Sequence, residues 1–290
     1  MVVLVDNRLK GLVALLLTSL LWGTSFPAIK DVTSFVNEYT YTWVRSLIAI
    51  AGLVPYLIYR RDRVSKSLIK GGIMAGLAYA LGLWLQGWGT RYTSASNSAF
   101  ITGLSVVFVH VYTGAVKGEY SYRLGITLIL SLLGLYMLTN PSSGFNIGDF
   151  LVLLGSFMWA AQIILVSKYS GGDPLIFTLF EMVPALMFVV PDILFNGYGG
   201  IDLRSFLIIS YLAIVCSNVA FALQVYGQRY IVPAVAAVIF LVEPVSASFF
   251  SYIFLGEVML LHQLIGAGMI LVAMFVASTD KPVMTKLEEK

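Results

Sequence analysis

The sequence predicts an all-α polytopic membrane protein in which ten transmembrane helices form two inverted five-helix repeats. Three observations support this prediction. First, 59% of the 290 residues are apolar and only 11% are charged, whereas soluble domains carry about 25% charged residues. Second, the chain divides into apolar segments long enough to cross a bilayer. Third, a segment that begins at Leu85 recurs in related form 138 positions later, at Leu223.

The predicted spans are set by length, because a helix needs about 20 apolar residues to cross a hydrocarbon core of about 30 Å. Polar residues and Gly or Pro interruptions separate them. The predicted ranges are 10–31, 38–59, 68–90, 94–116, 123–139, 147–168, 174–194, 203–227, 231–254 and 259–278. The connections are mostly tight turns and leave no room for a soluble domain.

The internal repeat aligns the segment Leu85–Glu119 with Leu223–Glu257 without a gap. The shared residues are Leu85/Leu223, Gln86/Gln224, Gly89/Gly227, Arg91/Arg229, Tyr92/Tyr230, Ala99/Ala237, Ile101/Ile239, Val107/Val245, Gly118/Gly256 and Glu119/Glu257. Five helices per repeat is an odd number, so the second copy must enter the membrane from the opposite face. We expect the first repeat at 1–140, the second, inverted repeat at 141–279 and a cytoplasmic tail at 280–290. Inverted repeats create two near-equivalent conformations, as alternating access requires.

The distribution of basic residues predicts the orientation, because short cytoplasmic loops retain Lys and Arg. With the N-terminus inside, three basic residues fall outside: Lys30, Arg91 and Arg204. The cytoplasmic set is Arg8, Lys10, Arg60, Arg61, Arg63, Lys66, Lys70, Lys117, Arg123, Lys168, Arg229, Lys281, Lys286 and Lys290. We therefore expect a multi-pass protein of the plasma (inner) membrane with both termini in the cytoplasm.

Composition also argues against several classes of function. The net charge of +3 is spread over short loops without a basic block, so we expect the lipid bilayer and a small-molecule substrate as partners, and no nucleic acid. A membrane-embedded enzyme would need a clustered nucleophile and base or metal ligands. Two histidines and Cys216 do not supply them. A passive channel is harder to exclude, although no charged ring or filter-like loop is present.

Several short motifs occur in a fixed order along the spans. They are Trp22-Gly23-Thr24-Ser25-Phe26, Arg91-Tyr92-Thr93-Ser94-Ala95, Leu241-Val242-Glu243-Pro244-Val245, Gly118-Glu119 and Gly256-Glu257. In these motifs, over essentially its whole length, the chain resembles the EamA-type ten-helix permeases of the drug/metabolite transporter superfamily. The resemblance implies a secondary permease that exports or takes up small metabolites, often amino acids, through a cavity between the repeats. It implies neither an ATPase nor a cofactor.

One departure from that family pattern concerns the fourth span. The proline that family members often carry there is Val106, and Ser105 occupies the position that corresponds to Glu243. The two halves therefore need not be functionally equivalent.

Two tryptophans are predicted at equivalent depths near the middle of the membrane. Trp22 and Trp159 lie there by the helical rise of about 1.5 Å per residue, although tryptophan is usually enriched at the interfaces. They are predicted cavity walls, with simple helix packing as the alternative. Ser25 and Gln162, three residues further on, share their faces and offer hydrogen bonds to a solute.

Ionisable residues within the spans are costly, which makes Arg45, Glu181 and Glu243 functional candidates. Helical rise places Arg45 and Glu243 at a similar depth and Glu181 closer to the inner edge. We expect Arg45 to meet a substrate carboxylate and Glu243 an ammonium group or a proton. A structural ion pair between the two is the alternative. Proton exchange at Glu243 or Glu181 and simple equilibration of solute both stay open.

Further polar and aromatic residues complete the predicted lining: Tyr79, Trp84 and Asn218 are candidates, with helix-to-helix hydrogen bonding as the alternative. Four glycines, Gly125, Gly134, Gly266 and Gly268, are typical of close helix contact, either within the chain or in a homodimer.

Two carboxylates at span ends have a different expected role. Glu119 and Glu257 are expected to stabilise the turn into the following helix.

Overall fold

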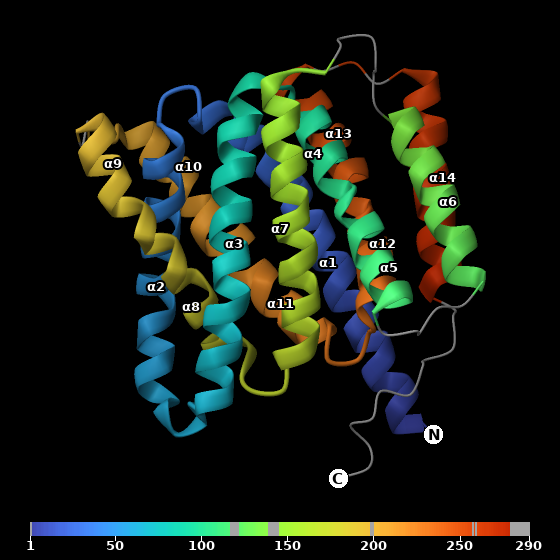
Figure 1. Ribbon diagram of the computed structural model, residues 1–290, viewed down its shortest axis with the longest axis horizontal. Helices are drawn as coiled ribbons and strands as arrows, with labels where there is room; N and C mark the ends of the chain where they lie inside the picture. Colours follow the sequence, from blue (N-terminus) through green and yellow to red (C-terminus); the bar gives the residue numbers. More distant parts are fainter. Residues whose placement is uncertain are drawn as a thin grey trace.

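The computed structural model describes residues 2–116, 122–138, 145–197, 200–256, 258 and 260–278. Within these ranges every regular element is helical, which confirms the predicted all-α class. The helices stand side by side as a bundle (Figure 1). The residues Glu119 and Glu257 and the tail at 280–290 lie outside the described ranges.

The first repeat contains six helices that correspond to the first five predicted spans. They are α1 (Val2–Val32), α2 (Glu38–Tyr59), α3 (Lys66–Tyr92), α4 (Ala95–Gly103), α5 (Ser105–Ala115) and α6 (Tyr122–Leu138), with the short 3-10 helix η1 (Arg61–Arg63) between α2 and α3. The helices α4 and α5 together form the fourth span, which is broken at Leu104.

The second repeat follows the same plan but is more interrupted. Its elements are α7 (Ile147–Tyr169), α8 (Pro174–Met182), η3 (Val183–Phe188), α9 (Val189–Asn196), α10 (Leu203–Tyr211), the π-helix η4 (Leu212–Val219), α11 (Ala220–Gly227), α12 (Pro233–Phe240), α13 (Val242–Leu255) and α14 (Leu261–Ser278). Eight segments of the described chain are long and apolar enough to cross a membrane, and Tyr122–Met137 and Leu261–Ala277 are shorter apolar helices.

Polar side chains fix where the helices begin, because they accept hydrogen bonds from amides that have no partner within the helix. Asn37 caps α2 and Asp173 caps α8, each accepting from the second and third residues that follow. Ser65 and Asp202 cap α3 and α10, each accepting from the third residue that follows. The paired caps show that equivalent positions of the two repeats start equivalent helices.

The third span of each repeat packs against the first span of the other repeat. The helix α3 packs along α7, and α1 packs along α11. Each contact includes a glycine pair: a Cβ on Gly89 would lie 2.5 Å from the carbonyl oxygen of Gly148, and a Cβ on Gly227 would lie 2.9 Å from that of Gly11. The pair Gly11/Gly227 lies near the start of α1, on what we call the N-terminal face. The pair Gly89/Gly148 lies at the opposite face, as inverted repeats require.

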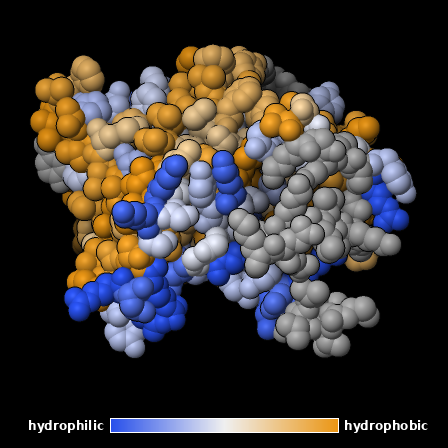
Figure 2. Space-filling view, turned by 60° about the horizontal axis from the view of Figure 1, so that its bottom comes forward, coloured by the Kyte–Doolittle hydropathy of each residue, from blue (hydrophilic) through white to orange (hydrophobic). Residues whose placement is uncertain are grey.

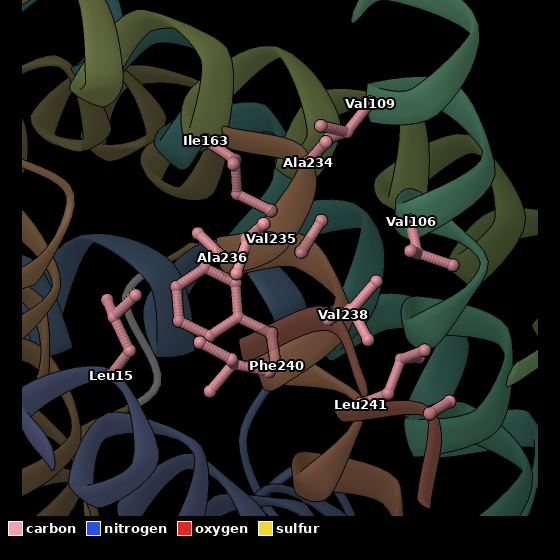
Figure 3. Packing of buried hydrophobic residues seen from close by; sticks show 14 of the residues in the cluster. Leu15, Val106, Val109, Ile163, Ala234, Val235, Ala236, Val238, Phe240 and Leu241 are labelled. Carbon is pink, nitrogen blue, oxygen red and sulfur yellow. The ribbon is translucent and has the colours of Figure 1, made fainter. Parts of the chain in front are cut away.

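A tightly packed core surrounds α12, and every residue of this helix is buried. Its small and branched side chains fill the space between α1, α5 and α7 (Figure 3). Leu15 of α1, Val106 and Val109 of α5 and Ile163 of α7 belong to the same cluster. Phe240, the last residue of α12, extends from this core to the cavity described below.

The predicted close contact between glycine-bearing helices is present within the chain. A Cβ on Gly134 of α6 would lie 2.7 Å from the carbonyl oxygen of Gly266 of α14, whereas Gly268 meets open space. Gly134 and Gly266 therefore serve an intrachain contact, and the homodimer stays a prediction.

The outer surface is apolar around the flanks of the bundle. Large hydrophobic side chains such as Phe195, Phe275 and Leu133 are exposed there. Figure 2, with the N-terminal face turned forward, shows hydrophilic side chains gathered on that face and hydrophobic ones over the flanks. This distribution is that of a protein surrounded by lipid.

Candidate substrate cavity

A cavity lies between the two repeats and contains about 490 Å³ of space free of atoms, counted out to its opening. Both repeats contribute to its walls. The first repeat supplies Trp22, Ser25, Arg45, Leu83, Gln86, Thr102 and Ser105, and the second supplies Trp159, Gln162, Ile163, Phe221, Phe240 and Glu243. Most of these residues form equivalent pairs, such as Trp22 with Trp159 and Ser105 with Glu243.

Six of the nine residues that the sequence predicts for the site line this cavity: Trp22, Ser25, Arg45, Trp159, Gln162 and Glu243. The other three do not belong to its lining. Tyr79 is fully buried and packs edge-on against Phe221, with ring centroids 5.1 Å apart. Trp84 stacks on Phe188 at 5.2 Å. The side-chain amide of Asn218 donates to the carbonyl oxygen of Ala49 at 3.0 Å.

The two tryptophans form apolar walls. The indole Nε1 of Trp22 donates to the carbonyl oxygen of Cys216 at 3.0 Å, so this side chain presents its ring and not its donor to a solute. Its ring centroid lies 4.9 Å from that of Phe221 and 5.3 Å from that of Phe240. Trp159 packs against Tyr79 and Phe221. These rings give a solute an apolar surface between the polar groups.

Breaks in two spans place polar side chains on the cavity. The amide of Leu104 donates to Ile101 and that of Leu241 to Val238, which tightens each helix at its last turn. Ser105 follows the first break, and Glu243 lies two residues after the second. Both spans are thus interrupted at nearly the same position of the repeat, beside the cavity.

Arg45 is the basic residue of the cavity, and it is held by neutral groups. Its Nε donates to Ser217 Oγ at 2.9 Å, and its Nη1 donates to Tyr41 Oη at 2.6 Å. Only 3% of the residue is exposed. Within the described ranges no carboxylate forms an ion pair with it. The alternative of a structural ion pair with Glu243 is therefore not realised in this structure.

Glu243 also lines the cavity and is buried. Its backbone carbonyl accepts a hydrogen bond from Ser246, but its carboxyl group has no hydrogen-bond partner among the described residues. Arg45 and Glu243 thus face one cavity without neutralising each other. Such an arrangement leaves a cationic group and an acidic group free to meet a ligand.

Two glutamines that the sequence analysis did not assign to the site, Gln86 and Gln224, belong to hydrogen-bonded pairs at the cavity. Gln162 Nε2 donates to Glu181 Oε1 at 2.6 Å and to Gln224 Oε1 at 3.0 Å, while Gln224 Nε2 donates back to Gln162 Oε1 at 2.9 Å. Gln86 donates to Thr102 at 3.1 Å. The sequence signal that could have identified Gln86 and Gln224 is that glutamine recurs at this position in both repeats. Their hydrogen bonds in the structure then show that both belong to the polar groups at the cavity.

An ion pair ties the loops together at the N-terminal face. Asp173 accepts hydrogen bonds from Arg63 at 2.9 Å and from Tyr56 at 2.8 Å. Partial burial acts to raise the pKa of the Asp173 carboxyl, but the hydrogen bonds from Arg63 and Tyr56 outweigh burial and hold this pKa below its usual range. Asp173 therefore joins α2, η1 and α8 at one end of the bundle.

A sequence model of a protein family, described as the EamA-like transporter family, matches residues 9–140 and 146–279. The chain belongs to this family. An uncharacterized transporter of Archaeoglobus fulgidus is 31% identical over 275 residues, which cover 94% of this chain and 87% of the relative. A WAT1-related chloroplastic protein of Arabidopsis thaliana is 26% identical, and the match covers 89% of this chain and 66% of that protein.

A solved crystal structure supports the fold. It matches with a TM-score of 0.76 at 17% identity, covering 94% of this chain and 98% of that chain. The family resemblance expected from the motifs is confirmed, and the chain is a multi-pass membrane transporter of small solutes.

Proposed function

We propose that this transporter moves small zwitterionic solutes, amino acids or close relatives, by alternating access through the central cavity and without ATP. One observation supports this proposal above all others. Arg45 and Glu243 line the same cavity without forming an ion pair. A zwitterion brings a carboxylate to the guanidinium and an ammonium group to the carboxyl, and so supplies the partner that each group lacks.

The energetic argument rests on the cost of ionisable groups in the membrane. Such groups are expensive there unless they meet water or a partner of opposite charge. Tyr41 and Ser217 orient the guanidinium of Arg45 but do not neutralise it. A bound carboxylate would do so with a charge-assisted hydrogen bond.

The inverted repeats support alternating access. Two halves of related structure and opposite orientation can exchange conformations, so that one cavity opens in turn to each face. We infer from the basic loops that the N-terminal face is cytoplasmic and that the membrane is an inner or plasma membrane. Glu243 is then the residue at which a proton would exchange with the ammonium group, if transport is driven by a proton gradient.

The test is counterflow in proteoliposomes, with radiolabelled neutral amino acids as the first probes. We expect saturable exchange that Arg45→Gln and Glu243→Gln each reduce by at least about tenfold, which corresponds to about 1.4 kcal/mol. Ser46→Ala is the matched control, because Ser46 is buried in the same helix as Arg45 and does not line the cavity.

Three outcomes would contradict the proposal. Unimpaired exchange in both variants, normalised to folded protein, would remove Arg45 and Glu243 from the site. Flux that does not saturate and shows no counterflow would indicate a channel. Conversion of the solute to a product would indicate an enzyme. Repeating the measurement with and without a pH gradient, at zero membrane potential, separates proton exchange from passive equilibration.

A further inference from the structure

Three polar residues beside the cavity have equivalents in the other repeat. Arg45 and Glu181 each lie eight residues after the cap of their helix, Asn37 and Asp173 respectively. Ser25 and Gln162 each lie three residues after a cavity tryptophan, and Gln86 matches Gln224. We call Ser25, Gln86 and Arg45 the first polar set, and Gln162, Gln224 and Glu181 the second polar set.

The two polar sets lie on opposite sides of the middle of the membrane. Arg45 is about 10 Å from the start of α2, and Glu181 is about 10 Å from the start of α8. The helix α2 starts at the face opposite the N-terminal face, whereas α8 starts at the N-terminal face (Figure 1). The sets therefore occupy the two ends of the region around the cavity.

The two ends of the pair formed by α2 and α8–α9 have equivalent hydrogen bonds. Asn37 donates to Asp192 Oδ1 at 3.0 Å at one end, and Tyr56 donates to Asp173 Oδ2 at 2.8 Å at the other. The alignment that matches Arg45 with Glu181 also matches Tyr56 with Asp192. Both ends of the α2 and α8–α9 pair thus keep equivalent contacts.

The interior, in contrast, is asymmetric. All three members of the first polar set line the cavity, but only Gln162 of the second set does. The side-chain amide of Gln162 is occupied by Glu181 and Gln224. Glu181 is fully buried, its Oε2 has no hydrogen-bond partner, and no basic side chain among the described residues forms an ion pair with it. The polar groups of the second set thus hydrogen-bond to one another and not to the cavity, and Glu181 Oε2 is left without a partner.

We propose that the second polar set is a second binding site, which opens to the cavity from the N-terminal face when the first set closes. The cavity then offers the Glu181 carboxyl and two amides in place of the Arg45 guanidinium, and it favours a cationic ammonium group over a carboxylate. This inference rests on the proposed transport function. It adds that the charged group supplied by the exposed polar set changes from the guanidinium of Arg45 to the carboxyl of Glu181 between the two states.

The test uses thiol accessibility without any solute, so its result does not depend on identifying the substrate. The native Cys216 is first replaced by Ser. Single cysteines are then introduced as Arg45→Cys and Gln86→Cys in the first set and as Glu181→Cys and Gln224→Cys in the second. A membrane-impermeant methanethiosulfonate reagent is applied to right-side-out and inside-out vesicles. Thr42→Cys and Thr178→Cys are matched controls, since both threonines are fully buried, three residues before Arg45 and Glu181, and outside the cavity lining.

We expect the first set to react only from the face opposite the N-terminal face and the second only from the N-terminal face, with both controls unreactive. In the Arg45→Cys/Glu181→Cys variant, prior reaction at position 45 should slow reaction at position 181 by about tenfold. A cationic reagent should react about tenfold faster than an anionic one at Gln224→Cys, because Gln224 shares the Gln162 amide with Glu181. The cationic reagent should react more slowly than the anionic one at Gln86→Cys, because Gln86 lines the same cavity as Arg45.

The proposal is overturned if both sets react from the same face, or if either set is unreactive from both faces. It is also overturned if reaction at position 45 leaves position 181 unaffected, or if both sites prefer the same reagent charge. Gln224→Cys provides the same test if Glu181→Cys fails to fold. A positive labelling result with no amino-acid counterflow would retain the two-site exchange and reject only the proposed substrate class.

Discussion

Gly89 and Gly148 bring α3 and α7 into backbone contact, with a Cβ on Gly89 only 2.5 Å from the carbonyl oxygen of Gly148 and 2.6 Å from Val152 Cγ2. Since neither a backbone carbonyl nor a packed helix can move aside cheaply, this contact fixes how the first repeat meets the second. Its counterpart, Gly11 with Gly227, is at the opposite end of the bundle.

We therefore predict that Gly89→Ala destabilises the protein by about 1–3 kcal/mol through overpacking. The control is Gly268→Ala in α14, where an added Cβ meets open space, so that the better helix propensity of alanine should leave stability unchanged or raise it. The measurement is the fraction of monodisperse protein that survives heating in detergent. Equal survival of both variants would show that the α3–α7 contact tolerates separation.

The two cavity tryptophans should respond differently to removal of their indole N–H. Trp22 Nε1 donates to Cys216, whereas Trp159 Nε1 has no hydrogen-bond partner among the described residues. We expect Trp22→Phe to cost about 1 kcal/mol more than Trp159→Phe, because it removes an established hydrogen bond. Thermal unfolding of the two variants, run in parallel, measures the difference. A larger loss for Trp159→Phe would mean that its indole has a partner in the membrane.

The pair of Gln162 and Glu181 should be energetically coupled. Gln162→Ala removes the hydrogen-bond donor to the buried Glu181 carboxyl, and an unsatisfied buried group costs about 1–3 kcal/mol. A double-mutant cycle with Glu181→Ala should then give a coupling energy of about 0.5–3 kcal/mol. Thermal or denaturant unfolding in detergent provides the four stabilities. Strict additivity would show that the contact contributes nothing.

Asp173 should make the free energy of unfolding depend on pH in the acidic range. Its pKa is held below the usual range by Arg63 and Tyr56, which outweigh the effect of burial. A carboxyl whose pKa is depressed in the folded state stabilises that state above the unfolded pKa, and this contribution is lost as the pH falls through the folded pKa. Asp173→Asn should therefore lower the melting temperature near neutral pH, and the difference from the native protein should shrink in acid.

The matched control for this effect is Asp202→Asn. Asp202 caps α10 as Asp173 caps α8, but it forms no ion pair among the described residues. Asparagine remains a good cap, so the Asp202 variant reports capping alone and should lose less stability near neutral pH. Equal losses in the two variants would assign the whole effect to capping.

Much of the fold follows from the sequence because membrane spans are constrained by length and hydropathy. The predicted second span, 38–59, coincides with α2, and the predicted eighth span, 203–227, coincides with α10 to α11. The π-helix Leu212–Val219 within that eighth span was not predicted. A shift in hydrogen-bond register leaves the composition unchanged, so an apolar segment gives no sign of it.

The sequence predicts how deep in the membrane a residue lies, but it does not predict which side of its helix faces the cavity. Site residues could therefore be predicted where depth determines membership of the lining, and not where the rotation of the helix about its axis determines it. Trp22 and Arg45 were placed by their distance along a span, and both line the cavity. Tyr79 and Trp84 lie on α3, whose residues are apolar or small nearly all round, so no periodic pattern shows which of its faces meets the cavity. Leu83 and Gln86 on the same helix are the residues that do.

The complete burial of α12 bears on how the protein assembles. This helix starts at a proline and is buried by α1, α5 and α6 of the first repeat and by α7 and α14 of the second. Its burial is complete only when helices that precede it and helices that follow it in the chain have packed against it. We therefore expect neither repeat to bury α12 without the other, so that the two halves of the molecule complete their folding together.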